Sequence, residues 1–470
     1  MALSDAVIGG TAAARRGMLI GSGRLASLPS LAEESCLAGR LDALRGRSVI
    51  IVVRDPFTLA VVLLELDGLA RRMVLCTPDL PSEFLPRVVR SAGADVWLSD
   101  SSQSPPPGVG IDLAVEADPA PLPLRVPRSS SADDYRWNTE WVLLTSGTTG
   151  APKLVAHTLA SLTNAFSSDP DFAEGGGAPP VWSTFYDIRR YGGLQIYLRA
   201  LYGGSLVLPS AGEAITEYLA RAAAAGVTHI SGTPSHWRKA LMSGAAQLLS
   251  PAYVRLSGEI ADQGILDALR AAFPRAMVAH AFASTEAGVG FEVRDGRAGF
   301  PECLVGRSEQ GVELDVSRGT LRIRSPGNAS AYLGDDAPPL KDAEGFVDLG
   351  DRLELRDGRY YFVGRSGGII NVGGLKVHPE EVEAVINSHP RVRMSLVRSR
   401  RNPIIGAIVT ADVVLADGTG GEESAAEERI RQEILEVCRR MLAAHKVPAQ
   451  ISFVQALAMS ASGKLVRANA

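Results

Sequence analysis

Short apolar runs and amphipathic segments alternate along the first part of the chain. Residues 48–53 (SVIIVV), 73–76 and 95–98 are mostly apolar runs of strand length, and such runs are typical of strands that are buried on both faces. Residues 56–72 and 86–92 lie between them, begin with proline and carry apolar positions at helical spacing, so they are predicted helices. Strands that alternate with helices predict parallel βαβ units.

The same alternation returns after residue 204. Strands are predicted at residues 205–208, 228–230 and 276–279, and helices at residues 213–225 and 261–273. We therefore expect a second layer of strands and helices within the same N-terminal region.

The pattern changes at two other places. Residues 102–131 hold seven prolines and several serines, which predict an irregular linker between the two αβ layers. From about residue 311 the apolar runs become short and alternating, which is typical of a small β subdomain. Its strands are predicted at residues 313–316, 321–323, 352–355 and 360–363.

The chain returns to an αβ pattern after a cluster of glycines at residues 364–368. Helices are predicted at residues 379–387 and 422–443, and strands at residues 394–397 and 404–414. The predicted fold is α/β: a large N-terminal domain of αβ layers plus a small β subdomain (residues 1–364), and a small α+β C-terminal domain (residues 365–470).

Composition and charge narrow the class of protein. The length of 470 residues and the apolar fraction of 46% predict at least two packed domains. Lysine and arginine (48) nearly balance aspartate and glutamate (52), so no electrostatic footprint for nucleic acid or an anionic membrane is expected. The longest apolar stretch near the N-terminus, residues 59–64, is too short to cross a bilayer, and no signal-peptide pattern begins the chain. We expect a soluble, cytoplasmic protein.

The four cysteines, Cys36, Cys76, Cys303 and Cys438, lie far apart. They form no metal-ligand spacing, so buried reduced thiols are the expectation.

Residues 141–158 (WVLLTSGTTGAPKLVAHT) carry the most informative chemistry. An apolar strand at residues 142–144 leads into a Gly/Ser/Thr loop, whose hydroxyls and backbone amides can surround a polyphosphate. Lys153 adds a positive charge. The spacing differs from that of the P-loop NTPases, and on bare chemistry such a loop is also compatible with a simple turn.

The order of residues in this loop resembles the signature loop of the adenylate-forming superfamily, which contains acyl-CoA synthetases, adenylation domains of peptide synthetases and firefly-type luciferases. The resemblance implies that the loop holds the β- and γ-phosphates of ATP. The implied phosphate contacts are Thr145, Ser146, Gly147, Thr148, Thr149, Gly150 and Lys153.

Three later motifs resemble this superfamily in the same order. In residues 280–288 (HAFASTEAG), the resemblance places Phe282 against the adenine face, Thr285 at the α-phosphate and Glu286 on Mg²⁺. In residues 345–352 (GFVDLGDR), it assigns Asp351 to the ribose hydroxyls, although a turn aspartate is the alternative. Arg365 is also assigned to the ribose.

The resemblance extends to the C-terminal region and implies that this domain is mobile. The usual hinge position falls at Gly367, and Gly373 and Gly374 would line a tunnel for a pantetheine thiol after rotation. Residues 457–467 (LAMSASGKLVR) are similar to the family's terminal motif, so Lys464 is the implied catalytic lysine. The resemblance covers about residues 45–467.

The acid pocket is less well specified by residues 181–204. Tyr186 and Asp187 match a Phe-Asp pair that holds the substrate amine in peptide-synthetase domains, while an N-cap role for Asp187 is an equal alternative. Solvated side chains are the favoured interpretation for Arg189 and Arg190. Further candidates for the pocket are Tyr191, Gly192, Ser257 and Gly258.

The implied reaction is ATP-dependent activation of a small-molecule carboxylic acid to an acyl-adenylate, with Mg²⁺ as cofactor, followed by acyl transfer to the thiol of CoA. Two alternatives share every motif: loading of a carrier-protein phosphopantetheine, and amide synthesis with an amine acceptor. A non-catalytic nucleotide-binding module is the alternative from another class. The joint presence of Glu286, Asp351, Arg365 and Lys464 argues against it.

Overall fold

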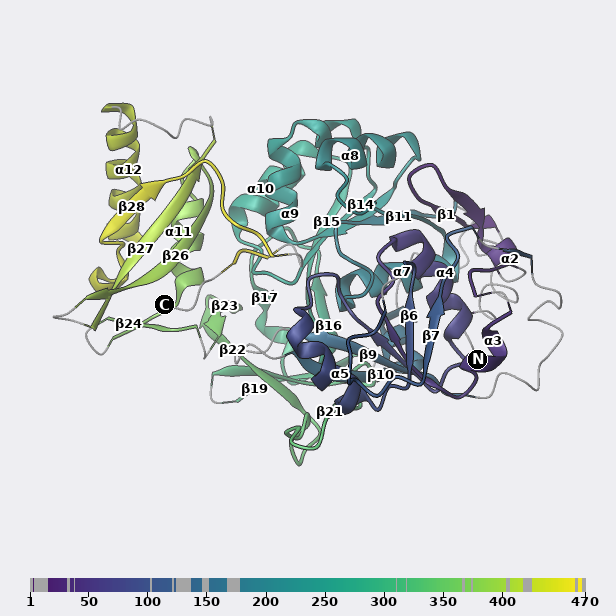
Figure 1. Cartoon of the computed structure of the whole chain (residues 1–470). Helices are drawn as coiled ribbons and strands as arrows, with labels where there is room; N and C mark the ends of the chain where they lie inside the picture. Colours follow the sequence, from purple (N-terminus) through teal and green to yellow (C-terminus); the bar gives the residue numbers. More distant parts are fainter. Residues whose placement is uncertain are drawn as a thin grey trace.

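The computed structural model shows a large body joined to a small one (Figure 1). The structure describes residues 3, 16–31, 34–37, 39–101, 104–120, 122–123, 137–145, 152–166, 178–309, 311–317, 319–365, 368–372, 375–402, 406–416, 425–460 and 464–466. The small body contains the C-terminal helix α12, and a yellow segment of chain runs from it back to the large body near α9.

One sheet of the large body has eight strands. Its six central strands, from β15 to β1, are parallel, and an antiparallel strand closes each edge. Across the sheet the order is β16 (Gly288–Val293), β15 (Met277–Ser284), β14 (Tyr253–Ser257), β13 (His229–Gly232), β11 (Val181–Thr184), β12 (Ser205–Val207), β1 (Met18–Ile20) and β2 (Leu25–Ser27).

A second sheet has seven strands, of which five neighbours are parallel. The other two form an antiparallel extension at one edge. Across the sheet the order is β21 (Ala331–Leu333), β10 (Lys153–Thr158), β9 (Glu140–Thr145), β5 (Arg72–Leu75), β4 (Ser48–Ile51), β6 (Val96–Ser99) and β7 (Leu113–Glu116). The parallel βαβ arrangement predicted from the alternating pattern is therefore confirmed.

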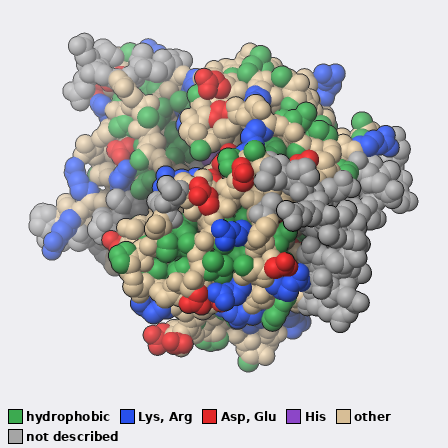
Figure 2. Space-filling view, turned by 45° about the vertical axis from the view of Figure 1, so that its right-hand side comes forward, with side chains coloured by type: hydrophobic (Ala, Val, Ile, Leu, Met, Phe, Trp, Pro, Cys, Tyr) green, Lys and Arg blue, Asp and Glu red, His purple; other side chains and the backbone are tan. Residues whose placement is uncertain are grey.

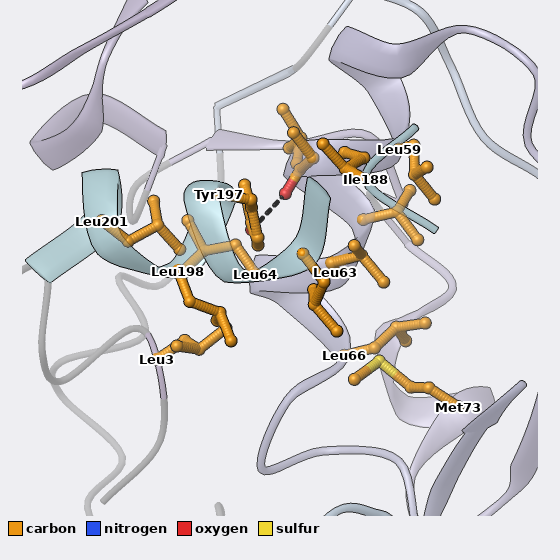
Figure 3. Packing of buried hydrophobic residues seen from close by; sticks show 14 of the residues in the cluster. Leu3, Leu59, Leu63, Leu64, Leu66, Met73, Ile188, Tyr197, Leu198 and Leu201 are labelled. Atoms are coloured by element: carbon orange, nitrogen blue, oxygen red, sulfur yellow. Dashed lines mark hydrogen bonds between the residues drawn. The ribbon is translucent and has the colours of Figure 1, made fainter. Parts of the chain in front are cut away.

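Two helices, α4 (Pro56–Leu66) and α7 (Tyr191–Gly203), pack in one core with strands of both sheets. Ten of the eleven residues of α4 are buried, which explains why all but Thr58 and Glu65 are apolar. Figure 3 shows Leu198 and Leu201 of α7 beside leucines of α4, and the Tyr197 hydroxyl donates to the backbone carbonyl of Ala60 at 2.7 Å. This packing fixes the position of α7, whose first turn borders the candidate site.

The outer faces of the two sheets are covered by further helices. Side chains alternate along β4, so that Val49 and Ile51 face the shared core while Ile50 packs with Val88 and Val89 of α5 (Leu85–Ala92). On the eight-stranded sheet the covering helices are α8 (Ile215–Ala224), α9 (Pro234–Met242) and α10 (Gln263–Ala272). Shorter helices are α2 (Leu28–Leu31), α3 (Leu41–Leu44) and α6 (Leu159–Thr163).

A six-stranded antiparallel sheet forms the predicted β subdomain. Its core includes Phe300, Leu314 and Ile323, together with Val293 from the edge of the eight-stranded sheet. The strands are β17 (Phe300–Pro301), β23 (Arg359–Arg365), β22 (Val347–Arg356), β20 (Thr320–Arg324), β19 (Val312–Ser317) and β18 (Ser308–Glu309).

The smaller C-terminal domain has its own hydrophobic core, which contains Val382, Val413 and Ile434. An antiparallel pair β24 (Ile370–Val372) and β25 (Leu375–Val377) precedes helix α11 (Pro379–Asn387). The remaining elements are β26 (Val392–Asn402), β27 (Gly406–Leu415), α12 (Ala425–Met441) and β28 (Gln450–Phe453). The domain boundary predicted at residue 364 stays a prediction.

Two predictions about local structure need correction, and one strand was missed. The helix predicted at residues 56–72 ends at Leu66, because Asp67 adopts an extended backbone and accepts hydrogen bonds from the Trp141 indole and the Leu3 amide, both at 2.9 Å. The proline-rich stretch 102–131 is not wholly irregular, since it contains β7 and the short strand β8 (Leu122–Pro123), which pairs with β3 (Glu34–Ser35). Strand β10 was not predicted, because its sequence KLVAHT mixes polar and apolar residues.

Acidic and basic side chains are interspersed over the face drawn in Figure 2. This matches the near balance of charges in the sequence. Among the described residues, no helix combines the length and the apolar content that a membrane span requires.

Candidate active site

The hairpin of β9 and β10 carries the predicted phosphate loop between its strands. Thr145 and Lys153 are paired at the end of the hairpin, so the intervening residues form the connection. Ser146, Gly147, Thr148, Thr149 and Gly150 lie outside the described residues. The Lys153 side chain is exposed, and its ammonium nitrogen lies 4.8 Å from the centre of the Tyr332 ring, a cation–π contact.

The same tyrosine links Lys153 to the predicted metal ligand. The Tyr332 hydroxyl donates to Oε1 of Glu286 at 3.3 Å. The backbone carbonyl of Glu286 also accepts from the amide of Ala329 at 2.9 Å. Lys153 and Glu286, which are 133 positions apart in the sequence, therefore lie around one tyrosine at the same end of the seven-stranded sheet.

A buried histidine, His157, fixes the backbone at Thr285. Nε2 of His157 donates to the backbone carbonyl of Thr285 at 2.6 Å, and Nδ1 lies 2.9 Å from the Ser161 hydroxyl. Burial lowers the pKa of His157 to about 4, so its ring is neutral near pH 7. A neutral imidazole keeps one N–H for the carbonyl, and this contact fixes the backbone that presents Thr285 and Glu286.

The other predicted nucleotide contacts lie at the junction with the β subdomain. Phe282 stacks on Phe362 with ring centres 5.2 Å apart and an angle of 7° between the rings. Asp351 is buried and pairs in register with Arg365 on the neighbouring strand. Only the backbone of Arg365 is described, and Gly373 and Gly374 lie outside the described residues.

The segment before the C-terminus reaches the large body near α9 (Figure 1). The Leu465 amide donates to Oε1 of Glu259 at 3.2 Å, and Oε2 of the same carboxylate accepts from the Ser235 amide at 2.9 Å. Gly258 has a φ of +82°, and a side-chain carbon built at Gly258 would lie 3.5 Å from Cε of Lys464. The side chain of Lys464 therefore extends along the glycine turn at the end of β14.

A small cavity of about 10 Å³ lies between the start of α7 and the ends of the central strands of the eight-stranded sheet. Four of the predicted pocket residues line it: Tyr186, Tyr191, Gly192 and Ser257. Gly193, next to the lining, is held so close to the Asp187 carbonyl that an added side-chain carbon would approach that oxygen to 2.3 Å. The remaining lining residues are Gln195, Ile196, Ser231, Arg255, Ala283 and Val289.

Two tyrosines, Tyr186 and Tyr191, form part of the cavity wall. The Tyr186 hydroxyl donates to the carbonyl of Ser257 at 2.7 Å, and both phenols are buried. Burial raises the pKa of Tyr186 and of Tyr191 well above the usual range, so both hydroxyls stay protonated.

The carboxylate of Asp187 forms an ion pair with a neighbouring arginine, and Asp187 does not line the cavity. Its carboxylate accepts from Nε of Arg189 at 2.7 Å, and Arg189 in turn donates to the Val53 carbonyl at 2.6 Å. The predicted solvation of Arg189 is wrong, because its side chain is buried against this carboxylate. Arg190 forms an ion pair with Asp79 and stands at the N-cap of α7, so the N-cap role considered for Asp187 is also wrong.

Glu286 would form a Mg²⁺ site only together with the phosphates of a bound nucleotide. The described residues contain no group of three His, Cys, Asp or Glu side chains that could hold a metal by themselves. Mg²⁺ is usually bound through one or two carboxylates plus the phosphates of a substrate. Glu286 alone suits that role.

Several residues of the site were missed by sequence reasoning. His157 and Tyr332 support the nucleotide side, Glu259 receives the C-terminal segment, and Gln195 and Arg255 line the cavity. A polar residue within an otherwise apolar strand or helix was the available signal for His157, Gln195 and Arg255. No signal pointed to Tyr332 or Glu259, since their roles depend on contacts between distant segments.

Comparison with family models gives two matches along the chain. The family described as AMP-binding enzyme matches residues 41–333, and the AMP-binding enzyme C-terminal domain matches residues 381–464. Together they cover the hairpin, Glu286, the cavity and Lys464.

Curated relatives match parts of the chain. The human mitochondrial acyl-coenzyme A synthetase ACSM2A is 33% identical over 160 residues, which are 34% of this chain and 27% of that protein. This chain thus spans about a quarter of the length of the first relatives that it matches. The 4-hydroxybutyrate–CoA ligase 1 of Metallosphaera sedula is 27% identical over 379 residues, 72% of this chain and 63% of that protein.

Solved structures match nearly the whole fold. The amide bond synthetase McbA from Marinactinospora thermotolerans aligns with a TM-score of 0.77 and 19% identity, over 98% of this chain and 97% of that one. The anthranilate CoA ligase AuaEII, in complex with anthranoyl-AMP, aligns with a TM-score of 0.78 and 18% identity, over 99% of this chain and 95% of that one. At these identities the likeness shows a shared fold.

Proposed function

The chain belongs to the AMP-binding enzyme family, and from this premise we propose that it activates a carboxylic acid as an acyl-adenylate and transfers the acyl group to the thiol of CoA. One observation carries the proposal: Lys464 extends along the Gly258 turn beside a small cavity lined in part by Ser257, while Glu286 and Lys153 meet around Tyr332. An acid in the cavity would thus have its carboxylate near a cation.

In the first half-reaction a carboxylate oxygen of the acid attacks the α-phosphorus of ATP, and the bond to the β-phosphate oxygen breaks to release pyrophosphate. The protein's task is to position the two anions and to balance the charge that develops between them. Lys464 would place its ammonium at the carboxylate and α-phosphate, and Lys153 would lie at the β- and γ-phosphates. Mg²⁺ held by Glu286 and the phosphates would supply Lewis-acid stabilisation of the leaving oxygens.

The supporting residues keep these groups in place. His157 fixes the backbone of Thr285, Tyr332 orients the carboxylate of Glu286, and Glu259 holds the amide beside Lys464. Asp351 and Arg365, which pair in register, are proposed for the ribose, and Phe282 for the adenine face.

In the second half-reaction the thiolate sulfur attacks the acyl carbonyl carbon, and AMP leaves with the electrons of the cleaved anhydride bond. Departure of Lys464 and approach of the Gly373–Gly374 loop, by rotation of the C-terminal domain, would open a path for the thiol. The names of the acyl-coenzyme A synthetase and CoA ligase relatives support CoA as the acceptor. The name of the amide bond synthetase keeps an amine acceptor as the second candidate.

Product analysis tests the acceptor. The full chain is incubated with ATP, Mg²⁺ and a panel of acids, and separate reactions receive CoA, a phosphopantetheinylated carrier protein or a primary amine. The proposal predicts AMP together with an acyl-CoA mass. Acylated carrier or amide, with no acyl-CoA, would overturn the choice of CoA while leaving adenylation intact.

A further inference from the structure

Two polar atoms in the wall of the cavity indicate which kind of acid it accepts. This inference rests on the proposed adenylation. We propose that the acid is short and bears a neutral hydroxyl or amino group on its acyl part, which donates to Gln195 and hydrogen-bonds with Ser231. Neither residue was predicted to be part of the pocket.

Gln195 offers an acceptor to the cavity. Its Nε2 donates to the backbone carbonyl of Leu162 at 2.7 Å, and this contact fixes which end of the amide is oxygen. The side chain is 2% exposed, and within the described part of the chain its Oε1 accepts no hydrogen bond. Since Gln195 lines the cavity, a donor inside the cavity would satisfy this oxygen.

Ser231 offers a second polar atom in the wall of the same cavity. It stands on β13, is 3% exposed and lines the same cavity. Its hydroxyl has no hydrogen-bond partner among the described residues. A hydroxyl can donate and accept, so Ser231 and Gln195 together suit a group that does both, such as an alcohol or an amine.

Leaving such atoms unsatisfied has a cost that an alkyl group cannot relieve. A buried polar group that loses its partner pays the full cost of its desolvation. An acid with only a hydrocarbon chain would displace any water from the cavity and leave both atoms unpaired. An acid with a hydroxyl or amino group would restore the hydrogen bonds.

The charges around the cavity favour a neutral group over a second carboxylate. Arg255, which also lines the cavity, already pairs with Glu292 at 3.1 Å. Glu292 further accepts from the Tyr253 hydroxyl and from Arg294, both at 2.7 Å. Although burial alone would raise the pKa of Glu292, Arg255 and these neighbours hold it below the usual range, so Glu292 is ionised and balances the charge of Arg255.

Arg255 and Val289 also limit the length of the acid. They line both this cavity and a second one of about 240 Å³. The room left in the first cavity is about 10 Å³, which suits one group the size of a water molecule. A short acyl group is therefore expected, with its polar end near the wall.

Matched acids test the proposal in the full-length protein. Acid-dependent ATP–pyrophosphate exchange is measured for 4-hydroxybutyrate against pentanoate, for 3-hydroxybenzoate against 3-methylbenzoate, and for glutarate. In at least one pair the hydroxyl member is expected to have a kcat/KM about ten- to a hundredfold higher than its methyl partner. Methyl partners that equal or exceed the hydroxyl members, or glutarate as the best substrate, would overturn it.

Variants connect the preference to the two atoms. Ser231→Ala and Gln195→Leu should each lower the ratio of the two kcat/KM values by about fivefold or more, with the methyl partner kept or improved. Ser183→Ala is the matched control: its hydroxyl is also buried, on the neighbouring strand, but it donates to the Val207 carbonyl at 2.9 Å. It should lower the melting temperature and leave the ratio unchanged. Unchanged ratios in both test variants, with normal melting temperatures, would contradict the assignment.

The outcomes separate this inference from the function on which it rests. Absence of exchange with every acid would count against adenylation itself. Robust exchange with alkyl acids and no preference for hydroxyl or amino acids would leave adenylation standing and remove only the inference.

Discussion

The nucleotide side and the acid side of the site are built in opposite ways. Lys153 and Lys464 on the nucleotide side are exposed, and Glu286 is partly exposed. On the acid side, Gln195 and Ser231 are 2% and 3% exposed. The charged groups stand at the ends of a hairpin and a terminal segment, whereas the acid-side groups project from the middle of packed elements.

This difference follows from what each side must do. Groups that meet a polyphosphate must admit a large hydrated anion and release pyrophosphate, so they lie at the surface and depend on neighbours such as Tyr332 for orientation. Groups that discriminate between acids work best when they are shielded from water. A substrate that leaves a buried polar atom unpaired then binds less tightly. Changes on the nucleotide side should therefore alter rate, and changes on the acid side should alter preference.

The largest effect is expected for Lys464→Ala. Loss of a preorganised charge at the developing transition state should lower the rate of ATP–pyrophosphate exchange by about 10²–10³. Folding should be unaffected, since the side chain is exposed. Lys239→Ala removes an exposed lysine from α9 as the control and should keep full exchange. Wild-type exchange in Lys464→Ala would remove that residue from the chemistry.

Glu286→Gln should have the next largest effect. The amide keeps the shape but loses the charge that fits Mg²⁺, so exchange should fall by about 10–100-fold and recover in part at high Mg²⁺. Tyr332→Phe removes the hydrogen bond to Glu286 but keeps the carboxylate, so its exchange rate should fall by less. Glu302→Gln, an exposed carboxylate elsewhere, is the control. A loss in Glu286→Gln that is independent of Mg²⁺ concentration would argue against a metal role.

His157 predicts a pH effect on stability. The folded pKa of about 4 lies below the usual 6.5, so its stabilising contribution is present above pH 6.5 and is lost as the pH falls toward 4. Between pH 7 and pH 5 this residue alone should reduce the free energy of unfolding by about 2 kcal/mol. His236, whose pKa burial also lowers to about 4, adds a similar term.

Urea denaturation at several pH values measures this effect. His157→Gln should be less stable at pH 7 but lose less stability on acidification than the unmodified chain. His445→Gln, at a partly exposed position in the C-terminal domain, should keep the full pH dependence. An identical pH dependence in His157→Gln and the unmodified chain would show that the ring is not buried in its neutral form.

The smallest effect is expected for Glu259→Gln, which weakens the docking of the terminal segment. Loss of charge from the acceptor of the Leu465 amide should slow exchange by about two- to tenfold. Acyl transfer from a synthetic acyl-adenylate to CoA should be unchanged, because that step is proposed to follow departure of the segment. Equal slowing of both half-reactions would indicate that Glu259 serves only the local fold through Ser235.

The sequence predicted the fold and the family better than it predicted the site. Apolar runs such as residues 48–53 need both faces buried, so their strand identity follows from local pattern alone, and the resemblance to adenylate-forming enzymes is confirmed. Asp67 ends helix α4 because Trp141, 74 positions away, requires an acceptor. No local pattern can carry that information.

The acid side shows the same limit. Tyr186 and Asp187 are neighbours in the sequence, yet Tyr186 lines the cavity while Asp187 binds Arg189. Gln195 is a polar position on a mostly apolar helix, and only the fold brings it and Ser231 to the same cavity. Chemical motifs identify groups that act on ATP, whereas the choice of acid depends on contacts between segments far apart in the chain.

Acid-dependent ATP–pyrophosphate exchange tests the central claim most directly. The account predicts exchange that requires both Mg²⁺ and an acid, is strongest with a short hydroxy or amino acid, and is reduced about 10²–10³-fold in Lys464→Ala. A folded protein that binds ATP yet catalyses no exchange with any aliphatic, aryl or amino acid would contradict it.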